Sequence, residues 1–167
     1  AVLRSANSGL DRLLSVTDPR NLTTSYTVDG LGNQTALSSP DTGTATKTYD
    51  EAGNLKTVTD ARGKTTSYTY DALNRVTRIA YSNGTATTFE YGGGTAGAPN
   101  AAGRLTKITD ESGQTSYAYD PLGRMLTKVQ TTGTGAAAKT YTVGYAYGST
   151  GNTGNTDAPH LHFQVMS

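Results

Sequence analysis

The sequence contains no cysteine, no tryptophan and few large aliphatic residues. Without cysteine, the chain forms neither disulfides nor thiolate metal sites. Leu, Ile, Val and Phe together supply only about 15% of the residues, below the roughly 20% that is common in disordered chains. Disordered chains usually combine such low hydrophobicity with a high net charge, and here the formal net charge is only +1. The composition therefore favours a folded chain.

Further absences exclude several classes of function. No apolar run approaches the roughly 18 residues of a membrane-spanning helix. The 14 Lys and Arg residues are scattered, whereas a nucleic-acid-binding protein needs a basic patch or stripe. No stretch shows a helical period over ten or more residues. What the chain has instead is 31 Thr and 11 Tyr, two residue types that favour strands. We therefore predict an all-β protein.

The chain repeats itself with a period of 21 residues, marked by Asp29, Asp50 and Asp71. We call the Asp position zero. The same spacing leads back to Ser8 and forward to Gly92, and later zeros fall at Asn100, Asp120 and Gly148, so an insertion lies near residues 92–100. Aromatic residues precede position zero, and a basic residue often follows it by four. The predicted structural residues of the repeat are Tyr49, Asp50, Tyr68, Tyr70, Asp71, Arg75, Phe89, Tyr91, Arg104, Tyr117, Tyr119, Asp120 and Arg124.

Each period reads as a β-hairpin with two tight turns. The second turn begins ten residues after position zero, as in Asp60-Ala61-Arg62-Gly63 and Asp110-Glu111-Ser112-Gly113, and Asp, Asn and Gly suit such turns. Aromatic residues two apart share one face of a strand. Apolar residues three apart, such as Leu55 and Val58, do not fit simple alternation. Either a β-bulge or a strand covered on both sides explains that spacing.

The Tyr-Asp-x-x-Gly-Arg-Leu unit, at about 21-residue spacing from Ser8 to about Gly148, resembles the YD repeat of Rhs proteins, insecticidal toxin complexes and teneurins. The resemblance implies one strand-turn-strand per repeat, wound into a continuous twisted sheet. In known members this sheet forms large secreted shells that often enclose a toxic C-terminal domain. Six or seven repeats are too few for a closed shell, so we expect an open shell or solenoid that is part of something larger.

The composition changes after residue 148, and we predict a division into a repeat array at 1–148 and a tail at 149–167. The tail holds a Gly/Asn/Thr loop and then His160-Leu161-His162-Phe163. It resembles the end of lysostaphin-like (LytM-type) zinc endopeptidases. That resemblance implies His162 as a zinc ligand and His160 as a catalytic imidazole. The family also needs an earlier His-x-x-x-Asp motif, and this sequence has only 2 His.

Because a catalytic zinc usually takes three protein ligands, we predict no enzymatic activity and no cofactor for this chain alone. Zinc would bind only if another chain or segment supplied the missing ligands. Our first hypothesis is a structural β-repeat scaffold of a secreted or cell-surface bacterial protein, a shell wall or a self-associating fibre. Its partners would be neighbouring repeats or identical subunits that pair through open sheet edges. The alternatives are a C-terminal fragment of a peptidoglycan-cutting zinc endopeptidase and a glycan-binding adhesin.

Overall fold

The computed structural model describes residues 4–92, 99–133, 137–147 and 163–166. The chain forms two compact units, residues 1–85 and 86–167, and every regular element in the described part is a strand apart from a single residue of 3-10 turn. The fold is therefore all-β, as the sequence predicts. No helix in this part of the chain has the length and hydropathy needed to cross a membrane.

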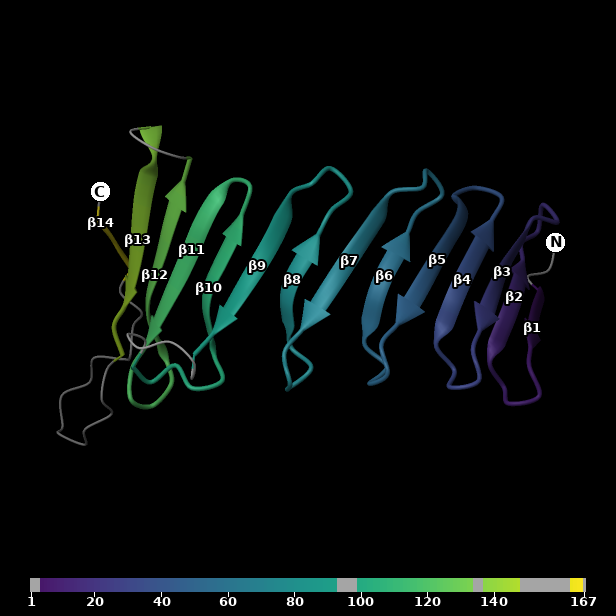
Figure 1. Ribbon diagram of the computed structural model, residues 1–167, viewed down its shortest axis with the longest axis horizontal. Helices are drawn as coiled ribbons and strands as arrows, with labels where there is room; N and C mark the ends of the chain where they lie inside the picture. Colours follow the sequence, from purple (N-terminus) through teal and green to yellow (C-terminus); the bar gives the residue numbers. More distant parts are fainter. Residues whose placement is uncertain (1–3, 93–98, 134–136, 148–162, 167) are drawn as a thin grey trace, which may run out of the picture. The chain divides into compact units, whose positions relative to one another are not determined.

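The first unit is an antiparallel sheet in which each strand pairs with the next one along the chain (Figure 1). This order is the simplest outcome for strands that are joined by tight turns. The strands are β1 (Arg4–Asn7), β2 (Leu13–Thr17), β3 (Thr23–Val28), β4 (Gln34–Ser39), β5 (Gly43–Tyr49), β6 (Leu55–Thr59), β7 (Thr65–Tyr70) and β8 (Val76–Ala80).

The second unit continues the same pattern of consecutive antiparallel pairs. Gly92 also bridges to Ala102 beside the insertion. The strands are β9 (Ala86–Tyr91), β10 (Leu105–Asp110), β11 (Gly113–Tyr119), β12 (Met125–Thr132), β13 (Lys139–Tyr145) and β14 (Phe163–Met166).

The insertion changes which residue takes position zero in the second unit. The Gly92 N–H donates to the Arg104 carbonyl at 2.8 Å, and the Gly103 N–H donates to the Gly92 carbonyl at 2.9 Å. These are the two bonds that a zero residue makes elsewhere, so the assignment of Asn100 as the zero is wrong. Counting back from Gly103-Arg104-Leu105 leads to Asn100. It does not lead to Gly92, because the extra residues lie inside the turn, between its first and last hydrogen-bonded residues.

A β-bulge in every repeat resolves the apolar residues that are three apart. Tyr49 pairs with Leu55 and Lys47 with Val58, and the register shifts between them. Because Tyr49 and Lys47 are two apart on one strand, Leu55 and Val58 share one face of the sheet. Register shifts recur at the corresponding place in the pairs β1–β2, β3–β4, β7–β8, β10–β9 and β11–β12.

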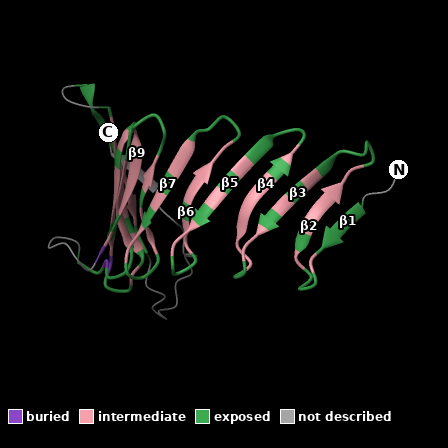
Figure 2. Cartoon of the chain, turned by 45° about the vertical axis from the view of Figure 1, so that its right-hand side comes forward, coloured by how far each residue is buried: buried purple, intermediate pink, exposed green. Residues whose placement is uncertain are grey.

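The sheets hold little fully buried material. Among the described residues only Gly92, Ala101, which is 1% exposed, and Asp120, which is 6% exposed, reach the buried class. Most strand residues of the first unit are half-buried and its turns are exposed (Figure 2). A sheet whose apolar face is covered by a second layer would show a buried core. Each unit therefore depends on contacts along the sheet, from one repeat to the next.

Candidate functional site: the seams between repeats

The turn at position zero is built by the carboxylate that begins it. The Asp50 N–H donates to the Asn54 carbonyl at 2.9 Å, and the Gly53 N–H donates to the Asp50 carbonyl at 3.0 Å. Asp50 Oδ1 then accepts the N–H groups of Ala52 at 3.0 Å and of Asn54 at 2.8 Å. Asp side chains commonly stabilise turns in this way. Asp29 and Asp71 accept the same two N–H groups in their own turns.

The third residue after position zero adopts a left-handed backbone. It is Gly53 with φ of 83° in one repeat and Asn74 with φ of 59° in the next. A type I turn followed by such a residue is a common three-residue hairpin loop, and only Gly, Asn and Asp adopt it at low cost. The turns at Asp60 and Tyr81 have the same bonding. The second turn at Asp110 has a different bonding pattern, because Asp110 pairs directly with Gly113 in a tighter two-residue turn.

Arginine at the fourth residue after position zero reinforces the carboxylate. The Arg75 guanidinium donates to Asp71 Oδ2 at 2.7 and 2.6 Å. Hydrogen bonds from the Arg75 side chain, and then from its backbone N–H, lower the pKa of Asp71 below 3.8. At Asp120, burial by itself raises the pKa, but the N–H and guanidinium of Arg124 outweigh it and the net pKa is lowered. These carboxylates are held ionised for structural reasons.

The tyrosine directly before position zero joins its repeat to the preceding one. The Tyr70 hydroxyl donates to the Leu55 carbonyl at 2.7 Å, and the Tyr119 hydroxyl donates to the Leu105 carbonyl at 2.7 Å. Tyr49 makes this bond to Gln34 at 2.9 Å and Tyr147 to Met125 at 2.8 Å. Each accepting carbonyl belongs to the first residue of a bulge, where the sheet ladder is interrupted. Desolvation raises the pKa of Tyr70 and Tyr119, so both hydroxyls stay protonated donors at neutral pH.

Arginine side chains also contact the neighbouring repeat. The Arg104 guanidinium lies 5.6 Å from the centre of the Tyr119 ring, and that of Arg124 lies 4.3 Å from the Tyr147 ring. Both distances are in the range of cation–π contacts. In the first unit the Arg12 side chain donates to the Asp29 carbonyl at 3.2 Å. The predicted structural residues thus meet where one repeat joins the next, and we call these contacts the repeat seams.

The remaining predicted aromatic residues lie on the same face as the seam tyrosines. Tyr68 pairs with Ile79, Phe89 with Ile108 and Tyr91 with Leu105, while Tyr117 pairs with Lys128. Sequence reasoning placed the repeat tyrosines among the structural residues and missed the hydroxyl bond to the preceding repeat. The available signal was Tyr rather than Phe at the last position before zero in most repeats.

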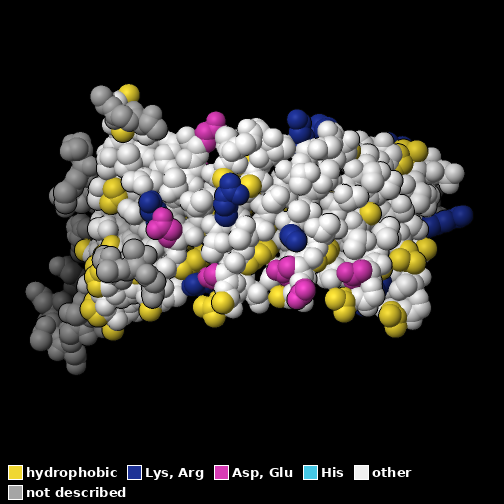
Figure 3. Space-filling view, in the orientation of Figure 1, with side chains coloured by type: hydrophobic (Ala, Val, Ile, Leu, Met, Phe, Trp, Pro, Cys, Tyr) yellow, Lys and Arg dark blue, Asp and Glu magenta, His cyan; other side chains and the backbone are white. Residues whose placement is uncertain are grey.

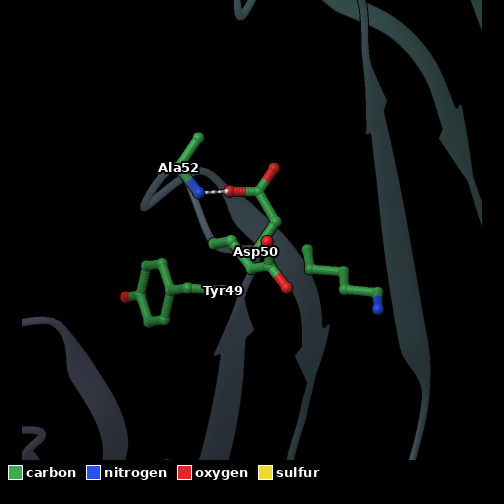
Figure 4. A pocket seen from close by; sticks show the side chains of 5 residues that line it. Tyr49, Asp50 and Ala52 are labelled. Atoms are coloured by element: carbon green, nitrogen blue, oxygen red, sulfur yellow. Dashed lines mark hydrogen bonds between the residues drawn. The ribbon is translucent and has the colours of Figure 1, made fainter.

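The hollow at the Asp50 turn does not suit a small substrate or a metal. The hollow at the Asp50 turn, about 500 Å³, is shallow and is lined by Tyr49, Asp50, Glu51, Ala52 and Lys56. Its Tyr49 ring and Asp50 carboxylate point away from each other, and the carboxylate is occupied by the Ala52 N–H (Figure 4). Within the described ranges, no three His, Cys, Asp or Glu side chains gather into a metal-binding group.

The predicted histidines of the tail, His160 and His162, lie outside the described residues. The part of the tail that is described, β14, pairs antiparallel with β13, so that Phe163 opposes Tyr145 and Met166 opposes Thr142. The assignments of a zinc ligand and a catalytic imidazole therefore stay predictions.

Comparison with known proteins gives matches in both sequence and fold. The sequence profile of the RHS Repeat family matches residues 49–86 and 100–137. No curated protein matches the chain. A Tc holotoxin pore of Photorhabdus luminescens superposes with a TM-score of 0.68 at 16% identity, and a TcdB2-TccC3-Cdc42 complex with 0.66 at 17%. A TcdB2-TccC3 structure without its hypervariable C-terminal region gives 0.68 at 16%.

These matches cover 87% of this chain but only 8% of each of those larger chains. At such low identity they establish the fold alone. The two profile matches span the turns and bulges at Asp50, Asp71 and Asp120. Two stretches of this chain therefore match the RHS repeat, and its fold is one found within these toxin-complex structures.

Proposed function

We propose that this chain is a structural segment, a stretch of RHS-repeat wall within a larger secreted or cell-surface bacterial protein. The observation that carries the proposal is the seam bond of tyrosine to the preceding repeat, made by Tyr49, Tyr70, Tyr119 and Tyr147. Side chains that recur in several periods and bind backbone serve the architecture, since an active site needs its groups only once.

The larger protein is inferred from the open sheet edge and from the proportions of the similar structures. β1 pairs only with β2 among the described strands, and all four of its residues are exposed. Such an edge offers unpaired backbone groups to another strand. The chain matches 8% of a much longer chain in each toxin complex. Neighbouring repeats or identical subunits therefore suit this edge, and the toxin complexes support an extracellular location.

The assembly state of the purified chain tests this proposal. An open edge adds copies one after another, so we expect a concentration-dependent series of masses in light scattering after gel filtration, and elongated particles in negative stain. A stable monomer that stays compact up to about 100 μM, far above the dissociation constants of specific interfaces, would contradict edge-to-edge joining.

We retain the proposal that the chain alone is no peptidase. One zinc ligand by resemblance, His162, falls short of the three that a catalytic zinc site usually has. Metal analysis after incubation with zinc and a peptidoglycan cleavage assay test it. Stoichiometric zinc together with cleavage would favour the endopeptidase alternative instead.

A further inference from the structure

The two faces of the first unit's sheet differ in chemistry. Register and bulges place large apolar side chains on one side, which we call the apolar face. Apart from the polar Gln34 and Lys47, its large side chains are Leu13, Val16, Tyr26, Val28, Leu37, Tyr49, Leu55, Val58, Tyr68, Tyr70, Val76 and Ile79.

The opposite side from β2 to β7 presents almost only hydroxyl groups, with Ala36 as the exception. We call it the hydroxyl face, and it consists of Ser15, Thr17, Thr23, Ser25, Thr27, Ser38, Thr44, Thr46, Thr48, Thr57, Thr59, Thr65, Ser67 and Thr69. Cross-strand hydroxyl pairs satisfy part of it, such as Thr48 with Thr57 at 2.6 Å. Hydroxyls that also bond water suit a solvated surface.

The apolar face has no covering layer in the described part of the first unit. Each of its side chains keeps some exposure, and the described residues of the buried class, Gly92, Ala101 and Asp120, belong to the second unit. A sheet that is apolar on one face is normally stabilised by packing that face on another layer. The apolar face is therefore a surface that another molecule can cover with a gain in stability.

We infer that the apolar face docks against the apolar face of a second copy of this chain. Eight strands about 4.8 Å apart and about 17 Å long present roughly 650 Å². Two such faces would bury about 1,300 Å² in total, within the roughly 1,200–2,000 Å² of stable specific interfaces. Sheets pack face to face in this way about 10 Å apart.

The low charge of the apolar face favours a second copy of the chain as its partner. Among the paired strand residues that the register places on this face, Lys47 carries the single charged side chain, and its ammonium already donates to Gln34 Oε1 at 3.3 Å. A charged partner would find almost nothing to pair with, and its own charges would lose water without compensation. An equally neutral, apolar surface avoids that cost, and a twofold interface supplies one because the same patch meets itself. Acidic and apolar side chains gather instead along the end of the sheet that carries the position-zero turns (Figure 3).

Neighbouring residues on β6 give a matched test. Val58 lies on the apolar face and Thr57 on the hydroxyl face of the same strand. We expect sedimentation equilibrium to show that Val58→Lys halves the oligomer mass of the chain, while Thr57→Lys leaves it unchanged. Far-UV circular dichroism checks that both variants keep their β-structure. The milder Val58→Thr, nearly identical in shape, should raise the dissociation constant roughly tenfold. This variant replaces Val58→Lys in the test if Val58→Lys does not fold.

Edge joining and face docking give different results. Edge joining produces an open-ended series of masses that Val58→Lys leaves intact, and that result would overturn the face inference while supporting the proposed wall function. Equal weakening by Val58→Lys and Thr57→Lys would also overturn it. A wild-type chain that stays monomeric rejects both modes.

Discussion

The Tyr70 hydroxyl is the one atom that distinguishes this residue from phenylalanine, and it decides whether the Leu55 carbonyl at the bulge has a partner. A half-buried carbonyl that loses its hydrogen bond costs about 1–2 kcal/mol. We therefore expect Tyr70→Phe to lower the free energy of unfolding by about that amount, measured by urea denaturation. Tyr68→Phe is the matched control on the same strand and face, and its expected change is below about 0.5 kcal/mol. Equal losses in both variants would show that the seam bond contributes nothing.

Gln34 is a residue of the apolar face that lowers the stability of the fold. Its Nε2 is buried without a hydrogen-bond partner, while the other repeats place Leu13, Leu55, Val76, Leu105 or Met125 at this position. We expect Gln34→Leu to raise the free energy of unfolding by about 1 kcal/mol, because it removes an unsatisfied donor and adds apolar contact. The Tyr49 hydroxyl keeps its backbone acceptor in this variant. A decrease in the urea midpoint would mean that the contact of Gln34 with Lys47 outweighs both gains.

In the turns, the cost of replacing a glycine depends more on its backbone conformation than on the space around it. Gly53 has φ of 83°, and an added Cβ would meet nothing within 4 Å. Gly53→Ala therefore costs only the left-handed strain, about 1–2 kcal/mol. In the preceding repeat's turn, Gly30 is equally open but is not in the left-handed region. Thermal melts of both variants test this, and Gly30→Ala should be neutral or slightly stabilising. If both variants lose the same stability, the strain explanation is wrong.

The turns also make the protein sensitive to acid. Hydrogen bonds lower the pKa values of Asp18, Asp29, Asp50, Asp60, Asp71 and Asp110 below 3.8. A carboxylate whose pKa is lowered by folding stabilises the fold fully above its unfolded pKa, and this contribution is lost as the pH falls through the folded pKa. We therefore expect urea midpoints to be level between about pH 5 and 7 and to fall below about pH 4. Asp71→Asn should show a smaller acid-induced loss than the wild type.

At the scale of the whole molecule, the period was readable from sequence because it repeats side chains that a turn requires. Asp at position zero and Gly or Asn three residues later define the hairpin loop, and their spacing gives the strand lengths. The bulge could not be chosen from sequence, since a strand covered on both faces gives the same spacing of Leu55 and Val58. Asn100 was wrongly assigned as a zero because hydrogen bonding, which places the zero at Gly92, defines this position. The tyrosine seam was missed because strand alternation predicts the face of a ring but not the partner of its hydroxyl.

Such an array should tolerate the loss of one complete period. Deleting residues 50–70 joins Tyr49 to Asp71, which restores a Tyr-Asp junction and keeps every later residue in phase with the 21-residue repeat. Contacts in a repeat array run mainly between neighbours, so we expect a folded β-protein with a lower urea midpoint. Deleting residues 50–69 instead leaves Tyr70 after Tyr49, a one-residue shift that turns apolar side chains toward the hydroxyl face. That variant should lose its cooperative transition, and equal behaviour of the two deletions would show that register is not set by the repeat.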